Sequence, residues 1–123
     1  MRKYIDFPKK EMKEMDFYDL YYGIESLVWY RGYFKRYFNK YKKNLTEKDI
    51  SKILKLISSD HIVVGHCSHN EIVQLYNNKV FGVDSSIKKG KYGEVLFIKK
   101  KGFFKGTLNG NSVKFKNTSY NKY

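Results

Sequence analysis

The sequence predicts an α+β fold in which one helix is followed by a short buried strand and a β meander. Three observations predict this class. Apolar residues recur at helical spacing near residues 46–57, a β-branched run follows at residues 62–64, and later apolar segments are separated by turn residues. Because helix and strands come in successive blocks rather than in alternation, the order favours α+β.

Two segments precede the helix and are less regular. Met12, Met15 and Leu20 can line a short helical face near the N-terminus. Ser26–Phe34 is a dense apolar run that holds one arginine, and we expect it to pass through the interior. Lys35–Asn44 is basic and aromatic, which indicates a loop or an irregular helix.

The helix has a clear N-terminal signal at Thr46. The Thr46 hydroxyl can cap the first turn, and Asp49 stands where a capping box needs its second member. Leu45 and Ile50 have the spacing of a hydrophobic staple. One stripe that we expect to be buried then follows at helical spacing, formed by Ile50, Ile53, Leu54 and Ile57.

β-Branched and aromatic segments predict the strands that follow the helix. Ile62–Val64 predicts a buried strand that stops at Gly65. Asn77-Asn78 is a suitable hairpin turn for the next pair of strands. The later strands are expected at residues 72–76, 80–83, 94–98 and 103–108, with a short last strand near Val113.

The composition indicates a single domain over residues 1–123. Apolar residues make up 41% and aromatic residues 18% of the sequence, which excludes a disordered tail. Pro8 is the sole proline, so no linker-like segment is evident. No uncharged stretch is long enough to span a bilayer, and no secretory signal follows Met1. We therefore expect no membrane partner.

Net charge and cysteine content bear on the binding partners and the cellular location of the chain. The formal net charge of +13 raises nucleic acid as a partner. The lysines are spread from Lys9 to Lys122 rather than clustered, which disfavours specific nucleic-acid binding. Cys67 is the sole cysteine, which excludes an intramolecular disulfide and favours a reduced, cytoplasmic location.

The candidate chemistry lies at Gly65-His66, where the predicted strand ends. The strand fixes the backbone, glycine permits close approach, and the imidazole projects from the strand end. Neutral imidazole is a good ligand for zinc, iron or manganese-type centres. Residue type alone leaves an alternative, a partly buried histidine bonded to a backbone carbonyl.

Several motifs around this element resemble one enzyme family. Asp60–Cys67 resembles the (I/V)VVGHT segment of calcineurin-like phosphoesterases, and Leu27–Phe34 resembles the LWYRGYF block of bacterial phosphatases of that type. Three further parts match the helix before the Gly-His strand, the hairpin after it and the closing strands: Leu45–Leu56, Glu71–Asp84, and Glu94–Ile98 with residues 102–111. The resemblance covers residues 24–111 and implies the C-terminal portion of a calcineurin-like metallophosphoesterase, that is, part of a β-sandwich flanked by helices.

The resemblance implies phosphomonoester hydrolysis at a binuclear centre of manganese, iron or zinc ions, which would activate a bridging water. His66 would ligate one of the two metals. Arg31 would contact the phosphate of the substrate, to which a guanidinium can bind through two hydrogen bonds. The alternative for Arg31 is a structural arginine stacked on Trp29 or Tyr30.

The sequence also departs from this family. The GDxHG, GDxxDRG and GNHE motifs, which carry the other metal ligands and the catalytic histidine, do not occur in it. We therefore expect no catalytic residue in this chain, weak metal binding, and activity only when a missing N-terminal half is supplied in trans. The expected partners are then a phosphorylated substrate and that half.

Two other interpretations stay open. His66, Cys67 and His69 suggest a small zinc site, although Cys67 also suits the core and no fourth ligand is evident. His61, which opens the predicted strand, is expected at the surface or at an edge. The chain could instead be a non-catalytic basic module that binds RNA or an acidic protein, with aromatic residues of Tyr30–Tyr41 stacking on bases.

Overall fold

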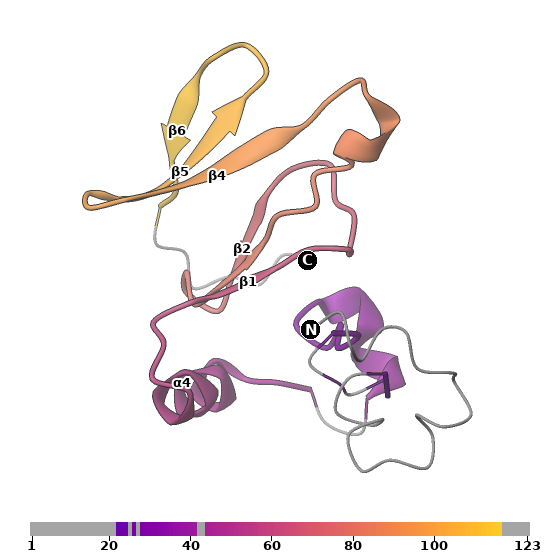
Figure 1. The fold of residues 1–123 in the computed structure, drawn as a ribbon. Coiled ribbons are helices and arrows are strands. Elements are labelled where there is room, and N and C mark those ends of the chain that lie inside the picture. The colour runs from indigo at the N-terminus through magenta and orange to yellow at the C-terminus, as the bar shows by residue number, and fades with distance from the viewer. Residues whose placement is uncertain (1–21, 25, 27, 42–43, 117–123) are drawn as a thin grey trace, which may run out of the picture.

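The computed structural model describes residues 22–24, 26, 28–41 and 44–116. Among these residues lie two three-stranded sheets, with helix α4 below them in Figure 1. The elements are η1 (Lys35–Lys40), α4 (Glu47–Leu56), β1 (Ile62–Val64), β2 (Val73–Leu75), β3 (Val80–Gly82), η2 (Ile87–Lys89), β4 (Glu94–Lys99), β5 (Gly102–Thr107) and β6 (Ser112–Lys114). The α+β class predicted from the sequence is confirmed.

Helix α4 begins as its sequence predicts. The Asp49 N–H donates to Thr46 Oγ1 (3.2 Å), and the Thr46 N–H donates to Asp49 Oδ2 (3.0 Å), which completes a capping box. Ile50 and Leu54 are buried. Ile57, the fourth member of the predicted stripe, is 54% exposed. It is the C-cap residue, so the helix has ended and its side chain leaves the buried face.

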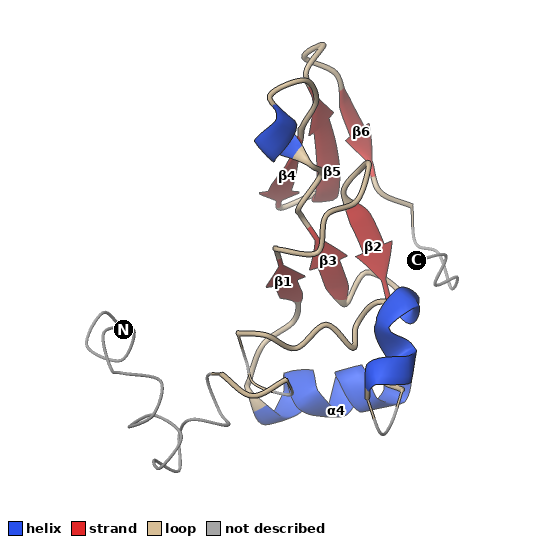
Figure 2. Ribbon diagram, turned by 90° about the vertical axis from the view of Figure 1, so that its right-hand side faces the viewer, coloured by secondary structure: helices blue, strands red, loops and turns tan. Residues whose placement is uncertain are grey.

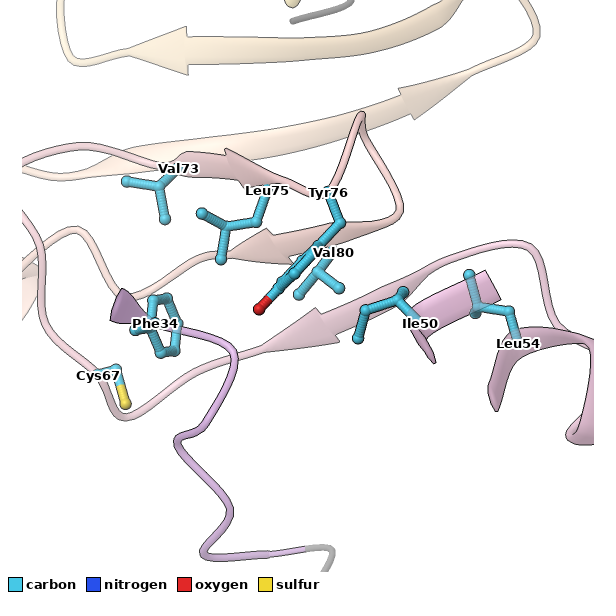
Figure 3. Packing of buried hydrophobic residues seen from close by; sticks show 8 residues of the cluster. All are labelled: Phe34, Ile50, Leu54, Cys67, Val73, Leu75, Tyr76 and Val80. Carbon is cyan, nitrogen blue, oxygen red and sulfur yellow. The ribbon is translucent and has the colours of Figure 1, made fainter. Parts of the chain in front are cut away.

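The first sheet has the order β1-β3-β2, with β1 parallel and β2 antiparallel to β3. Val73, Leu75 and Val80 pack on α4 and on Phe34 as one buried cluster (Figure 3). Strand β1 lies at the edge of this sheet, and Val63 is 48% exposed. The prediction of a buried strand is therefore wrong: Ile62 and Val64 are only partly buried, because β-branched residues also suit a half-buried edge.

The second sheet is an antiparallel meander with the order β4-β5-β6. Its three strands lie where the sequence predicts them, within a residue or two at the ends. The predicted continuous meander is nevertheless divided between two sheets. Ser86 and Gly90 flank η2 in left-handed conformations (φ 64° and 66°), and this turn separates β3 from β4 (Figure 2).

Aromatic rings fill the space between the two sheets. The Phe81 ring of β3 lies 4.6 Å from that of Phe103 and 5.6 Å from that of Phe115. His61 is exposed, as predicted, and its ring contacts Phe103 at 4.4 Å. The contact between sheets is therefore mainly apolar, which favours burial of both faces.

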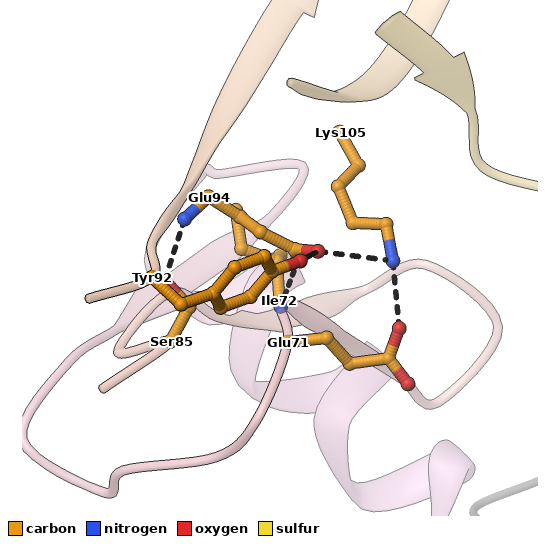
Figure 4. Close-up of polar contacts among 6 residues, drawn as sticks. All are labelled: Glu71, Ile72, Ser85, Tyr92, Glu94 and Lys105. Atoms are coloured by element: carbon orange, nitrogen blue, oxygen red, sulfur yellow. Dashed lines mark hydrogen bonds and ion pairs between the residues drawn. The ribbon is translucent and has the colours of Figure 1, made fainter. Parts of the chain in front are cut away.

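A polar network crosses the same boundary (Figure 4). The Glu94 carboxylate accepts hydrogen bonds from the Ile72 N–H (2.6 Å) and from the Tyr92 hydroxyl. Lys105 Nζ lies 3.4 Å from Glu94 Oε1 and 2.6 Å from Glu71 Oε2. The network thus connects the start of β2 to β4 and β5.

The segment before α4 differs in part from expectation. Ser26 and Phe34 are buried at its ends, but Val28 and Trp29 between them are 59% and 39% exposed. The segment turns back at the surface here, so the expectation that it runs through the interior is wrong for its middle. The irregular helix expected after it is confirmed as η1.

The helical face predicted from Met12, Met15 and Leu20 lies outside the described residues. Within the described part of the chain, no helix is long and apolar enough to cross a membrane.

Candidate functional site

The turn that follows β1 presents His66 to solvent. His66 is exposed and adopts a left-handed backbone conformation with φ 67°. The Cys67 N–H donates to the Gly65 carbonyl at 2.8 Å, which closes the turn. A methyl group built at Gly65 would meet no atom within 4 Å, so the close approach expected at this glycine is not present. The turn depends on the backbone of His66 rather than on Gly65.

Asp84, which follows β3, holds this turn through hydrogen bonds. Its Oδ2 accepts a hydrogen bond from the Ser68 hydroxyl (2.9 Å), and its carbonyl accepts one from the His69 N–H (2.8 Å). The Ser86 hydroxyl donates to the His69 carbonyl (2.8 Å), and the Ser86 N–H donates to Asp84 Oδ1 (3.0 Å). The position of His66 is thus fixed by the segment that follows β3.

Arg36 holds the turn from the other side. Its guanidinium donates to the Ser68 carbonyl at 3.1 Å and lies 5.0 Å from the centre of the Tyr37 ring. The contact joins residues 32 positions apart in the sequence. Because it fixes a backbone carbonyl, it orients the same turn that Asp84 holds.

Trp29, from the segment before η1, contacts His66, and Arg31 lies over the Trp29 ring. The Trp29 and His66 rings meet edge to face, with centres 5.6 Å apart and planes at 86°. The Arg31 guanidinium carbon lies 5.5 Å from the centre of the Trp29 ring. The Arg31 N–H donates to the Tyr41 hydroxyl at 2.7 Å, which fixes the backbone at this position. We call Trp29, Arg31, Arg36 and His66 the β1-end site.

The Cys67 thiol lies beside both arginines but is 4% exposed. Burial raises its pKa, and the charges and hydrogen bonds of Arg31 and Arg36 offset that rise only in part. Since the thiolate is the reactive form, Cys67 is a poor nucleophile in this fold. The sequence-based prediction that Cys67 packs in the core is confirmed.

Two further titratable groups support the turn. Burial lowers the pKa of His69, as does the charge of Arg36, while Asp84 acts in the opposite direction. Burial by itself raises the pKa of Asp84, but hydrogen bonds from Ser86 and Ser68 and the charges of Lys88 and His66 bring it below its ordinary value. The turn therefore contains a neutral histidine over an ionised aspartate near pH 7.

The chemistry of the β1-end site is that of an anion site. It gathers two guanidinium groups and an imidazole, whereas the carboxylate of Asp84 is engaged by Ser68 and Ser86. Arginine binds oxyanions such as phosphate well, because its planar fork can donate two parallel hydrogen bonds.

The structure brings the two predicted site residues together through Trp29. His66 and Arg31 both contact that ring, so the stacking alternative for Arg31 is present, and a phosphate contact of Arg31 stays a prediction. Sequence reasoning did not assign roles to Arg36 or Asp84. A basic residue two positions after a buried phenylalanine gives no local sign that it reaches a turn 32 residues away.

Comparison with known proteins gives a clear likeness to solved structures. No family model and no curated protein matches the chain. A cold-active protein tyrosine phosphatase superposes with a TM-score of 0.80 and 35% identity, covering 98% of this chain and 34% of that one. A point mutant of the cold-active enzyme superposes with a TM-score of 0.80 and 34% identity, covering 94% of this chain and 33% of that one. The cold-active protein-tyrosine phosphatase of a psychrophilic Shewanella species gives 0.79 and 35%, covering 94% and 33%. The chain thus spans about a third of the length of these phosphatases.

These structures correct the family expected from the sequence. The chain resembles protein tyrosine phosphatases, and the interpretation as the C-terminal portion of a calcineurin-like metallophosphoesterase is wrong. That interpretation rested on short motifs within residues 24–111, whereas the superposition spans 98% of the chain. The broader classes, phosphatase and hydrolase, agree with these structures; the metallophosphatase β-sandwich is not supported, although the α+β class stands.

The expected metal chemistry is corrected together with the family. Hydrolysis at a binuclear manganese, iron or zinc centre is not supported by the protein tyrosine phosphatases that the chain resembles. Among the described residues, no group of three or more His, Cys, Asp or Glu side chains could hold a metal ion. His66, Cys67 and His69 do not form such a group, so the small zinc site considered from the sequence is not found among the described residues.

The non-catalytic alternative is also corrected. A basic module for RNA or an acidic protein finds no support among structures that are enzymes. The arginines of the β1-end site contact Trp29, Tyr37 and the Ser68 carbonyl.

Proposed function

We propose that this chain contributes the phosphate-binding part of a protein tyrosine phosphatase, with Arg31 contacting the phosphate of the substrate. The observation that carries the proposal is the likeness to a cold-active protein tyrosine phosphatase, at 35% identity over 98% of this chain. Gathering of cationic side chains at the β1-end site supports the same conclusion. The reaction class is hydrolysis of a phosphate ester of tyrosine.

The chemistry suits a guanidinium in this position. A phosphate dianion accepts two parallel hydrogen bonds from one guanidinium, and charge-assisted bonds of this kind are stronger than neutral ones. Exposed His66 packs against the same Trp29 ring, and an imidazole N–H can donate a further hydrogen bond. The leaving group would be a phenolate, which departs more readily than the alkoxide of serine because the pKa of tyrosine is about 10.

The group that attacks phosphorus is not assigned to this chain. Cys67 is buried and its pKa is raised, which argues against a thiolate nucleophile here. Since the chain spans 34% of the similar phosphatase, we propose that full turnover needs the remainder of that fold as well. A reduced, cytoplasmic location belongs to the same proposal, because Cys67 is a free thiol.

Binding of O-phosphotyrosine to the purified chain, measured by isothermal titration calorimetry, tests the proposal. Arg31→Ala should weaken binding about 10- to 100-fold, which corresponds to the loss of a hydrogen bond to a charged group. The affinity of Arg31→Lys should lie between those of the unaltered chain and Arg31→Ala, since lysine keeps the positive charge but lacks the planar pair of N–H donors. Lys52→Ala, which removes one positive charge from the exposed side of α4, serves as the matched control.

The outcomes separate a phosphate site from general attraction to a basic protein. Saturable binding that Arg31→Ala weakens and Lys52→Ala leaves intact supports the proposal. Equal weakening by both variants, or no saturable binding by the unaltered chain, overturns it.

A further inference from the structure

We infer that Trp29 is a specificity-determining residue that contacts the aromatic ring of an aryl phosphate whose phosphate is bound by Arg31. The inference rests on the proposed function and deepens it, because it assigns recognition of the aryl group to one side chain. It concerns the same β1-end site and adds a subsite for the leaving group.

The fold fixes the position of Trp29 firmly. Its N–H donates to the Ser26 hydroxyl at 3.2 Å, and the Tyr30 N–H donates to the Ser26 carbonyl at 2.9 Å. Ser26 is 1% exposed, so this anchor is buried. The turn that carries Trp29 is thus tied to the interior although the ring itself is not.

Exposure of the ring distinguishes Trp29 from its aromatic neighbours. The side chain is 39% exposed, whereas Phe34 in the same segment is 1% exposed, and Tyr30 and Tyr33 are partly buried. Burial of a large aromatic side chain is favourable, and tryptophan left at a polar surface is typical of binding sites. The exposed part of the Trp29 ring can therefore contact a ligand.

The neighbours of the ring indicate the ligand. Arg31 lies over the ring at 5.5 Å, and His66 meets it at 5.6 Å. A phosphate held by Arg31 therefore lies next to the indole. The aryl group of phosphotyrosine is joined to phosphorus through a single oxygen, so it must lie beside Trp29, where offset or edge-to-face contact is favourable. The side chain of phosphoserine has no ring to make that contact.

The experiment uses a built-in reporter, because Trp29 is the sole tryptophan of the sequence. Its fluorescence should change on titration with phosphotyrosine more than with phosphoserine or inorganic phosphate. Affinities of Trp29→Ala and Trp29→Phe are then measured by calorimetry, with folding checked by circular dichroism. Val28→Ala, at an exposed apolar neighbour, is the matched control.

Trp29→Ala should weaken phosphotyrosine binding about 2- to 10-fold, as expected for the loss of one aromatic contact, and should leave phosphoserine and phosphate within about twofold. Trp29→Phe should retain most of the preference for phosphotyrosine over phosphoserine, and Val28→Ala should retain all of it. Equal weakening for all three ligands would overturn the inference, since Trp29 would then merely position Arg31. Unchanged phosphotyrosine affinity in Trp29→Ala would overturn it as well.

The same titrations separate this inference from the proposed function. Binding of all three ligands with no preference for the aryl phosphate overturns the role of Trp29 and leaves the phosphate site of Arg31 standing. Absence of binding by every ligand overturns both.

Discussion

The buried histidine of the β1 turn shows how one residue sets a dependence on pH. The His69 ring packs on Phe34, with centres 4.8 Å apart, and burial lowers its pKa below the ordinary value of 6.5. At pH values between the pKa of His69 in the folded chain and its pKa in the unfolded chain, the unfolded chain binds more protons than the folded chain. Stability therefore rises with pH in this window and is lost as pH falls below about 6.5. The lowered pKa of Asp84 acts in the same direction, but at pH values below 3.8.

We predict that the urea midpoint of the unaltered chain decreases between pH 7.5 and pH 5.5, and that His69→Asn shows a smaller decrease. The quantity compared is the change within each variant, so a general loss of stability cancels. His61→Asn, at an exposed histidine, is the control and should keep the dependence of the unaltered chain. Identical pH dependence in all three proteins would contradict the role of His69.

Cys67 gives a second prediction at this scale. Because burial raises its pKa and hides the sulfur, iodoacetamide should alkylate it in the folded chain at least on the order of tenfold more slowly than in urea. Mass spectrometry of samples quenched over time measures both rates. Equal rates would show that the thiol is accessible, and the argument against a thiolate nucleophile would then fail.

Among the elements, α4 depends on its first turn and on one buried face. The helix has 10 residues, which is too short for stability in isolation. The capping box of Thr46 and Asp49 and the burial of Ile50 and Leu54 are what hold it. Lys79 also forms an ion pair with Glu47, which joins the turn after β2 to the helix N-terminus.

Thr46→Ala should lower the free energy of unfolding by about 1 kcal/mol, the usual effect of losing a side-chain cap. Urea unfolding followed by circular dichroism measures this change. Lys52→Ala, on the exposed side of the same helix, should change stability by less than about 0.5 kcal/mol. A similar value for both variants would mean that the cap does not contribute.

For the whole molecule, stability depends on the contacts that join the two sheets. Phe81 and Phe103 supply apolar contact, and Glu94 supplies the polar contact to Ile72 and Lys105. Burial opposes the charge of Lys105, but its contacts with Glu71 and Glu94 outweigh that effect and raise its pKa. The contribution of Lys105 to the stability of the fold is thus present below pH 10.5 and is lost as pH rises beyond that value.

Glu94→Ala should lower the free energy of unfolding by about 3 kcal/mol or more, because the Ile72 N–H and Lys105 lose a buried carboxylate. The Glu94 side chain is 1% exposed, whereas that of Glu71 is 43% exposed. Glu71→Ala removes the other carboxylate from Lys105 and should cost less than about 1 kcal/mol, as solvent-exposed ion pairs do. Urea unfolding compares the two, and a larger effect at Glu71 would contradict this account.

The sequence by itself determined the elements whose signals are local. The capping box at Thr46 lies within four residues, and the turn at Asn77-Asn78 uses two residues that accept left-handed conformations, with φ 53° and 63°. The strands of the second sheet follow from their own β-branched and aromatic residues and from the turns between them. Such signals depend on backbone and side chains that are close in sequence, so pattern alone predicts them.

Only the tertiary structure decided which strands share a sheet and what surrounds His66. The bond from Arg36 to Ser68 spans 32 residues, and that from Ile72 to Glu94 spans 22. Contacts of this range depend on how whole elements pack, and no local pattern encodes them. For the same reason, a strand that ends in Gly-His predicted a metal ligand, whereas packing placed an indole beside that histidine and a guanidinium over that indole.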